Sequence, residues 1–175
     1  MSNIQNMSMR LNQLSEELTA AAQNGGMSEV GMIVSELSQI QAELQSAQAG
    51  VTPETSSAVR QELVNCRMVL HGMMNAVQDI RTAIAEQYRQ VLGENKTAFE
   101  QMDETAQQSG YAEAYRHRQL FQQMDQVSQQ LHQLDGSMLD AGYQMERGQV
   151  AGDSLNGAVT IEGLTSGTDD NGSLM

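Results

Sequence analysis

The residue types that most often bind metals or catalyse reactions are few in this chain and lie far apart. The histidines are His71, His117 and His132, and none is spaced from Cys or from another His as metal ligands usually are. Glu113 and His117 are four residues apart and therefore share one helix face. Two ligands are too few for a metal site, so we interpret this pair as a surface ion pair. We predict no metal site and no cofactor.

Sequence motifs of catalysis are also missing. The chain has no nucleophile elbow, phosphate-binding loop, dinucleotide fingerprint or zinc motif. Neighbouring acids occur at residues 103–104 and 169–170, but paired carboxylates catalyse reactions only in a pocket that shifts their pKa values. We expect the first pair on a solvated helix face and the second in the C-terminal tail. The sequence therefore predicts a protein that is not an enzyme.

The single cysteine, Cys66, rules out a disulfide within the chain, so the fold needs no oxidising compartment. We interpret Cys66 as a small buried side chain and keep a reactive thiol as the alternative. No apolar run approaches the length of about 18 residues that spans a bilayer. The N-terminus lacks a basic region followed by an apolar one. We expect a cytoplasmic protein, or one exported without a cleaved signal peptide.

The charge of the chain excludes one class of partner. The net charge is −13, and Lys96 is the only lysine. No segment shows a basic face with interleaved aromatic residues, so we predict no nucleic-acid binding and no attraction to anionic membranes. The most conspicuous polar-aromatic cluster follows Gly110. Ordinary packing at a hairpin tip and a recognition patch for a protein partner both explain it; its members are Tyr111, Tyr115, Arg116, His117, Arg118 and Phe121.

Apolar residues recur at every third or fourth position along most of the chain, which places each set on one face of a helix. Aromatic residues are only 3% of the chain, so these faces are narrow stripes rather than a thick core. The stripes are Ile4, Met7, Leu11, Leu14 and Leu18; Val30, Ile33, Leu37, Ile40, Leu44 and Ala47; Val59, Leu63, Cys66, Leu70, Met73, Val77, Ile80 and Ile84; and Leu120, Met124, Val127, Leu131, Leu134, Met138, Ala141 and Met145.

Local signals set the expected helix boundaries. A first helix over residues 2–22 ends at Gly25 and Gly26, and a second over residues 28–49 starts with Ser28 as its cap. Thr52 and Pro53 begin a third helix. Its pattern continues to about residue 108, unless it breaks near residues 93–95. A last helix is expected over residues 111–147.

The expected architecture is all-α and elongated, with three regions. Residues 1–50 form a helical hairpin, residues 51–148 a long central helix with a second hairpin, and residues 149–175 a flexible tail rich in Gly, Ser and Asp. The segment 158–161 of the tail is the one piece that could pair with a sheet edge, an unstructured tail being the alternative.

Residues 97–146 resemble the Trp-Xaa-Gly family, the small helical-hairpin substrates of type VII secretion. The resemblance lies in a helix, a turn at Ser109–Tyr115 and a second helix with spaced apolar residues from Leu120 to Tyr143. This chain has no Trp, and Tyr143 is followed by Glu146 and Arg147 rather than by the family's export motif. The resemblance implies export in complex with a helical partner and no catalytic activity.

The sequence as a whole favours a non-enzymatic helical assembly or interaction protein, associated with secretion and binding a helical partner. The alternative is a structural or scaffolding component of a phage or injection apparatus. We expect a protein partner or self-association through the apolar stripes. The candidate interface residues are Leu11, Leu14, Leu18, Leu37, Ile40, Leu44, Tyr111, Tyr115, Arg118 and Phe121.

Overall fold

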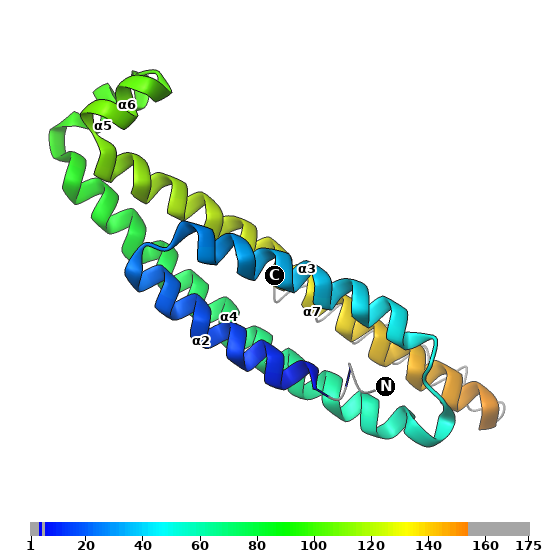
Figure 1. Cartoon of the computed structure of the whole chain (residues 1–175). Coiled ribbons are helices and arrows are strands. Elements are labelled where there is room, and N and C mark those ends of the chain that lie inside the picture. The colour runs from blue at the N-terminus through cyan, green and yellow to red at the C-terminus, as the bar shows by residue number, and fades with distance from the viewer. Residues whose placement is uncertain (1–3, 5, 154–175) are drawn as a thin grey trace.

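The computed structural model describes residue 4 and residues 6–153, and every regular element within them is a helix (Figure 1). The predicted all-α class is therefore confirmed, and Figure 1 shows its elongated hairpins. The last helix continues to Asp153, beyond its predicted end at residue 147, so residues 149–153 of the predicted tail are helical. The tail from residue 154 onward, with the segment 158–161, lies outside the described residues. In chain order the elements are α2 (Met7–Asn24), α3 (Met27–Gln48), α4 (Pro53–Leu92), η1 (Gly93–Asn95), α5 (Lys96–Gln101), α6 (Glu104–Gly110) and α7 (Ala112–Asp153).

Two glycines close the first hairpin, as predicted. Gly25 adopts a left-handed conformation with φ 67°, and the Gly26 N–H donates to the Ala21 carbonyl at 2.8 Å. The predicted cap of the next helix is wrong. Helix α3 begins at Met27, one residue before Ser28, and the Ser28 hydroxyl contacts the Glu29 carboxylate at 3.3 Å instead.

Helix α4 begins at the predicted signal and ends at the break that the sequence left open. Pro53 occupies its first turn, and the Thr52 N–H donates to Thr55 Oγ1 at 3.0 Å. The helix ends before Gly93, whose φ of 53° and ψ of −123° are open to glycine but not to residues with a side chain. The helical pattern that was expected to continue to about residue 108 is therefore broken at Gly93. Three short pieces, η1, α5 and α6, reverse the chain before α7.

The two hairpins pack together as a four-helix bundle. Helix α3 runs parallel to α7, because Gln41 bonds Ser137 at 2.5 Å and the Gln123 side chain bonds the Met27 carbonyl at 3.1 Å, with the same separation in sequence. Helix α2 lies along α4, where the Ser8 N–H donates to the Glu62 carboxylate at 2.9 Å. Figure 1 shows this layout, with α2 and α3 packed along the end of the longer α4–α7 hairpin that is away from α5 and α6.

One core joins all four long helices. Every member of the four predicted apolar stripes is either buried in it or packed against it. The regions 1–50 and 51–148 therefore mark two hairpins that share a core. Within the bundle, each apolar stripe is covered on both flanks by helices of the same chain. The Leu, Ile, Val and Met side chains of the stripes are therefore buried without the help of large aromatic residues.

Candidate functional site

The four-helix arrangement stops partway along the longer hairpin. The turn at Gly25 and Gly26 reaches α7 beside Gln123, whose amide bonds the Met27 carbonyl. Past this turn, α4 and α7 continue without α2 and α3 (Figure 1). We call residues 81–92 of α4 together with residues 112–122 of α7 the neck. We call η1, α5 and α6 the head.

The head has a small core of its own, centred on Phe99. This ring is fully buried and makes edge-on contacts with Tyr88 and Tyr111, with ring centroids 5.8 Å apart in each case. Leu92 and Ala114 complete the cluster. Five of the six aromatic residues of the chain lie in the head or the neck, and they are Tyr88, Phe99, Tyr111, Tyr115 and Phe121.

Arg118 joins the head to the neck. Its guanidinium stacks at 5.2 Å from the Phe99 ring and at 5.4 Å from the Tyr115 ring. Its Nη2 donates to Gln107 Oε1 at 2.7 Å, and Gln107 Nε2 donates to the Phe99 carbonyl at 2.8 Å. Gln107 is almost fully buried, and these two bonds satisfy both ends of its amide. Nothing in the periodicity of the sequence marks Gln107, because its role depends on a turn that the apolar pattern does not describe.

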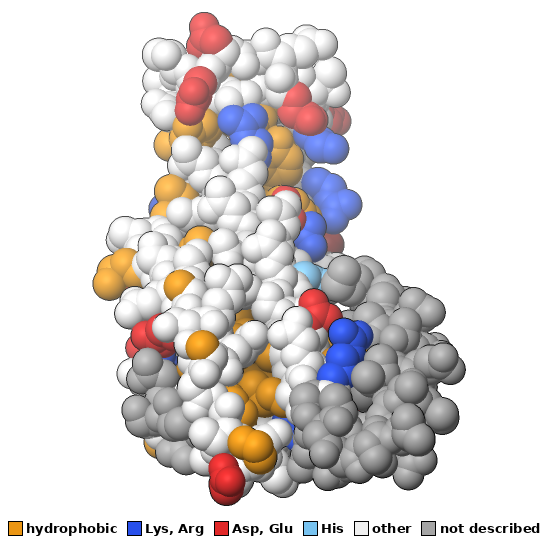
Figure 2. Space-filling view, turned by 90° about the vertical axis from the view of Figure 1, so that its right-hand side faces the viewer, with side chains coloured by type: hydrophobic (Ala, Val, Ile, Leu, Met, Phe, Trp, Pro, Cys, Tyr) orange, Lys and Arg blue, Asp and Glu red, His pale blue; other side chains and the backbone are white. Residues whose placement is uncertain are grey.

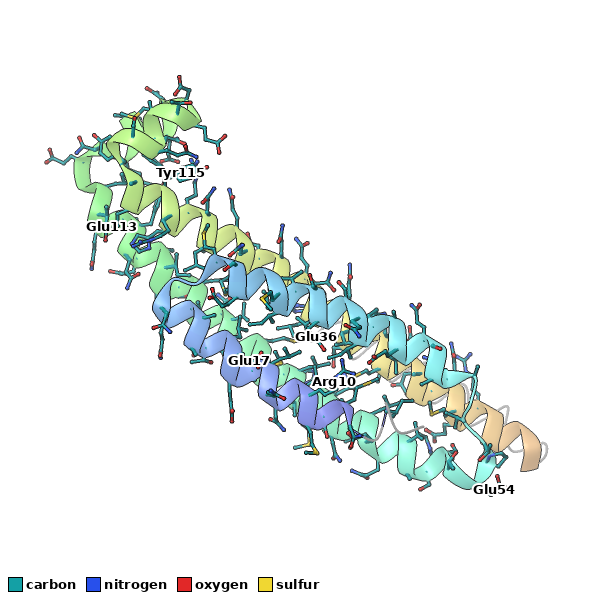
Figure 3. All side chains as sticks on the ribbon, in the orientation of Figure 1. Arg10, Glu17, Glu36, Glu54, Glu113 and Tyr115 are labelled. Atoms are coloured by element: carbon teal, nitrogen blue, oxygen red, sulfur yellow. The ribbon has the colours of Figure 1, made fainter. Side chains whose placement is uncertain are left out.

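Tyr115 fixes α6 against α7 at the point shown in Figure 3. Its hydroxyl bonds the Glu104 carboxylate, and the Gln119 amide donates to the same hydroxyl at 2.8 Å. The bond to Glu104 raises the pKa of Tyr115 above its ordinary value. The ring is 7% exposed, so Tyr115 acts in packing and presents little surface to a partner.

A groove of about 350 Å³ opens on the neck beside this network. Its floor is apolar, and Ile84, Ala85, Tyr88 and Phe121 supply it. Its rim carries Arg89, Lys96, Arg118, His117 and Glu100. Figure 2 shows Lys and Arg side chains gathered beside hydrophobic ones on the neck, below the head at the top of the view. This site is the candidate functional surface.

Burial and the charges around the groove both affect the pKa of its tyrosine, Tyr88. Burial raises the pKa of Tyr88, the Glu100 carboxylate adds to the increase, and Arg118 opposes it. Lys96 is half-exposed and reaches Glu100 only at 3.9 Å. Arg89 is exposed and donates to the Ala85 carbonyl of its own helix at 3.3 Å. Within the part of the chain that the structure describes, neither Arg89 nor Arg118 forms an ion pair with a carboxylate.

The structure separates the predicted interface residues into two groups. The first group lies in the bundle core, each side chain at most 6% exposed, against helices of the same chain. We correct the prediction that these side chains face a second chain, since they are inaccessible in this fold; they are Leu11, Leu14, Leu18, Leu37, Ile40 and Leu44. The second group lies in the head and neck, where Tyr111 and Tyr115 pack internally while Arg118 and Phe121 line the groove.

The histidines have partners other than metals. His71 lies 3.2 Å from the buried carboxylate of Asp135, which also accepts two bonds from Arg67 at 2.8 and 3.4 Å. His117 lies 3.7 Å from Glu113, the predicted pair on one helix face. His132 Nδ1 lies 2.8 Å from the Ser128 carbonyl. Among the described residues, no group of three His, Cys, Asp or Glu side chains could hold a metal ion.

Cys66 is fully buried in the bundle core, as predicted. Burial is the largest cause that raises the pKa of its thiol to about 12. The thiolate is the reactive form of cysteine, so this position disfavours the alternative of a reactive thiol.

Two further hollows lie on the bundle. One of about 680 Å³ runs between α2 and α3, where Arg10 bonds the carboxylates of Glu36 and Glu43 across the hairpin (Figure 3). The other, of about 320 Å³, lies at the link between α3 and α4. The first hollow is lined by Arg10 and by the carboxylates of Glu17, Glu29 and Glu36, whereas the lining of the second contains no charged side chain. None of the described helices is both long and apolar enough to cross a membrane.

Comparison with protein-family models, with curated proteins and with solved structures yields no match to this chain. The resemblance of residues 97–146 to type VII secretion substrates therefore stays a proposal. The geometry of the neck carries the functional argument.

Proposed function

We propose that this protein is a non-enzymatic interaction protein that binds another protein chain through the neck. The observation that supports this proposal is an open groove on the neck that contains aromatic side chains. It lies on the flank of the α4–α7 pair that carries the Arg81–Asp125 ion pair, whereas Gln123, which bonds Met27 of α3, is on the other side of α7. Tyr88 and Phe121 are half-buried there and line an open groove.

The surroundings of the groove fit binding better than catalysis. Its lining combines two arginines with a tyrosine, and these residue types are enriched among those that contribute most binding energy at protein interfaces. Its one carboxylate, Glu100, is about half exposed and lies 3.9 Å from Lys96, and its histidine, His117, lies 3.7 Å from Glu113 of the same helix.

In the leading version of this proposal, the protein is associated with secretion and leaves the cell with a helical partner. The head-and-neck hairpin supports this version, because it is the part that resembles the type VII substrates. In the alternative version, the protein is a scaffolding component of a phage or injection apparatus. The long, Gln-rich bundle supports that version.

A matched pair of variants tests the proposal. Ala85 lines the groove and Ala83, two residues earlier on α4, is exposed outside it. Ala85→Glu places a larger, charged side chain in the groove, and Ala83→Glu makes the same chemical change on the solvent face. Tagged versions are expressed in the cells that make the protein, cross-linked and purified. We expect one defined partner with the wild type and with Ala83→Glu, and its loss with Ala85→Glu.

Equal recovery of that partner with both variants would refute binding at the neck. Its identity separates the two versions. Release of the intact chain into the culture medium together with the partner supports secretion. Sedimentation with assembled particles supports the scaffold.

A further inference from the structure

We propose that Met9, Met32 and Met68 are the sites at which the folded protein takes up peroxide, each as a reversible methionine sulfoxide. None of the three lines the groove of the neck, so this inference is independent of the proposed function. It adds a covalent modification and the class of reagent that causes it.

Exposure divides the methionines of the described residues into classes. Met9 and Met32 are 71% exposed and Met68 is 69% exposed, and each lies on the surface of a different helix, α2, α3 or α4. Four others are at most 1% exposed in the shared core, and they are Met7, Met73, Met124 and Met138. Those of intermediate burial are Met27, Met74, Met102 and Met145. Peroxide in solution therefore meets the first three thioethers directly.

Two pairs of methionines show that the position around the helix sets this difference. Met7 and Met9 are two residues apart on α2, and Met68 and Met73 are five residues apart on α4. Separations of two or five residues turn a helix by much more than a right angle. In each pair, one side chain therefore faces the core while the other faces water.

The reaction needs no group besides the thioether and the peroxide. A lone pair of the sulfur forms a bond to one peroxide oxygen, and the O–O bond breaks. The other oxygen leaves as hydroxide, which takes the proton of the sulfur-bound oxygen and becomes water. The sulfur loses two electrons, and the same two electrons reduce the peroxide. A methionine sulfoxide reductase restores the thioether with electrons from a thiol.

The single thiol of the chain is a poor competitor for peroxide. Cys66 is fully buried, and burial is the largest cause that raises the pKa of its thiol to about 12. Peroxide oxidises the thiolate, which is therefore scarce at neutral pH. A thioether has no proton to lose, so its reaction depends on access to the sulfur rather than on a pKa.

The fold should tolerate oxidation at the three exposed positions. A sulfoxide is polar, and at these positions its oxygen faces water. The same change at Met73 or Met124 would place a polar oxygen without a partner in an apolar core, which opposes folding. We therefore expect two phases of oxidation, a first at the surface that keeps the helices and a second that requires the core to open.

Peptide mapping of the full-length protein after treatment with hydrogen peroxide tests this inference. Mass spectrometry assigns each added oxygen to one residue, in the native protein and in protein unfolded in guanidinium. In the native protein, we expect Met9, Met32 and Met68 to react at least about ten-fold faster than the four core methionines. In the unfolded protein, the rates should be similar. Met1 and Met175 lie outside the described residues and are left out of the comparison.

Met68→Leu and Met73→Leu form a matched pair of variants on α4. Met68→Leu should remove one fast-reacting thioether, whereas Met73→Leu should leave all three in place. The protein oxidised at the three exposed positions should keep its circular dichroism spectrum and its melting temperature. A methionine sulfoxide reductase should then remove the three added oxygens from the folded protein.

Three results would overturn the inference. Oxidation of Met73 or Met124 as fast as that of Met68 in the native protein would show that exposure does not select the sites. A loss of helicity when only the three exposed methionines are oxidised would show that they support the fold. Sulfoxides that the reductase leaves in place would show that the modification is not reversible. None of these results bears on the neck, which Ala85→Glu and Ala83→Glu test separately.

Discussion

Replacement of Asp135 by Ala tests whether the polar contact inside the bundle stabilises the fold. The Asp135 side chain is 7% exposed, and it accepts bonds from Arg67 Nε and Nη2 and lies beside His71. Asp125 is a matched control on the same helix. It also pairs with an arginine of α4, Arg81 at 2.6 Å, but its side chain is 41% exposed. Both substitutions remove one negative charge from the middle of α7.

The expected magnitudes differ because the two pairs differ in burial. Removal of one partner from a fully buried pair costs about 3–5 kcal/mol. Arg67 is 22% exposed, so water can solvate part of its charge, and we expect about 2 kcal/mol for Asp135→Ala. An exposed pair contributes about 0.2–1 kcal/mol, so we expect about 0.5 kcal/mol for Asp125→Ala. The gain in helix propensity from Asp to Ala is common to both variants and cancels in their difference.

The assay is urea unfolding followed by circular dichroism, supported by thermal melts. The difference of about 1.5 kcal/mol between the variants corresponds to about 3–6 °C in Tm for a chain of this size. High salt should reduce the effect of Asp125→Ala more than that of Asp135→Ala, because exposed charges are screened more strongly. Equal destabilisation by the two variants, or a stabilised Asp135→Ala protein, would refute the reasoning.

Three further predictions concern the thiol, two glycines and the shape. Because burial raises the pKa of Cys66 to about 12, the native protein at pH 8 should react with a disulfide reagent at least about a hundred-fold more slowly than the protein in guanidinium, and equal rates would contradict this. Gly72 lies within α4 with open space around an added methyl, so Gly72→Ala should stabilise the protein by about 0.5–1 kcal/mol. Gly93 has a positive φ, so Gly93→Ala should destabilise the protein by about 1–3 kcal/mol. Urea midpoints of the two variants that move in the same direction would contradict this. Small-angle scattering should give a radius of gyration of about 20 Å for a rod containing a helix of 40 residues, and the compact value of about 16 Å would contradict it.

The long helices were predictable because their signals are local. Leu63 and Leu70 belong to a spacing that only a helix places on one face, and the glycine pair at 25–26 and Pro53 mark ends that need no knowledge of the rest of the chain. The sequence left open whether the long helix breaks near residues 93–95, because a glycine within a helical pattern can be tolerated; in the structure Gly93 has a positive φ and the helix ends there.

The partner of each apolar stripe was not predictable from its spacing. Periodicity shows that Leu14 and Leu37 must be covered, but the same pattern serves an internal core and an interface with another chain. The structure covers both with α4 and α7, so the predicted interface was wrong for them. The contact between Asp135 and Arg67 could not be predicted from the sequence either, because the two residues are 68 positions apart.

The composition of the neck follows from its having two helices where the bundle has four. In the bundle, flanking helices cover Leu, Ile and Val, and none of the fully buried members of that core is aromatic. In the neck each helix has one neighbour, so wide rings and the stacked Arg118 supply the cover that is missing. The residues that close the head therefore also border the groove, and residue type alone cannot separate packing from recognition at positions such as Tyr88 and Phe121. Ala85 can separate them, because it shapes the groove without taking part in the ring stack. A loss of binding on Ala85→Glu with an unchanged melting temperature would thus be a property of the surface and not of the fold.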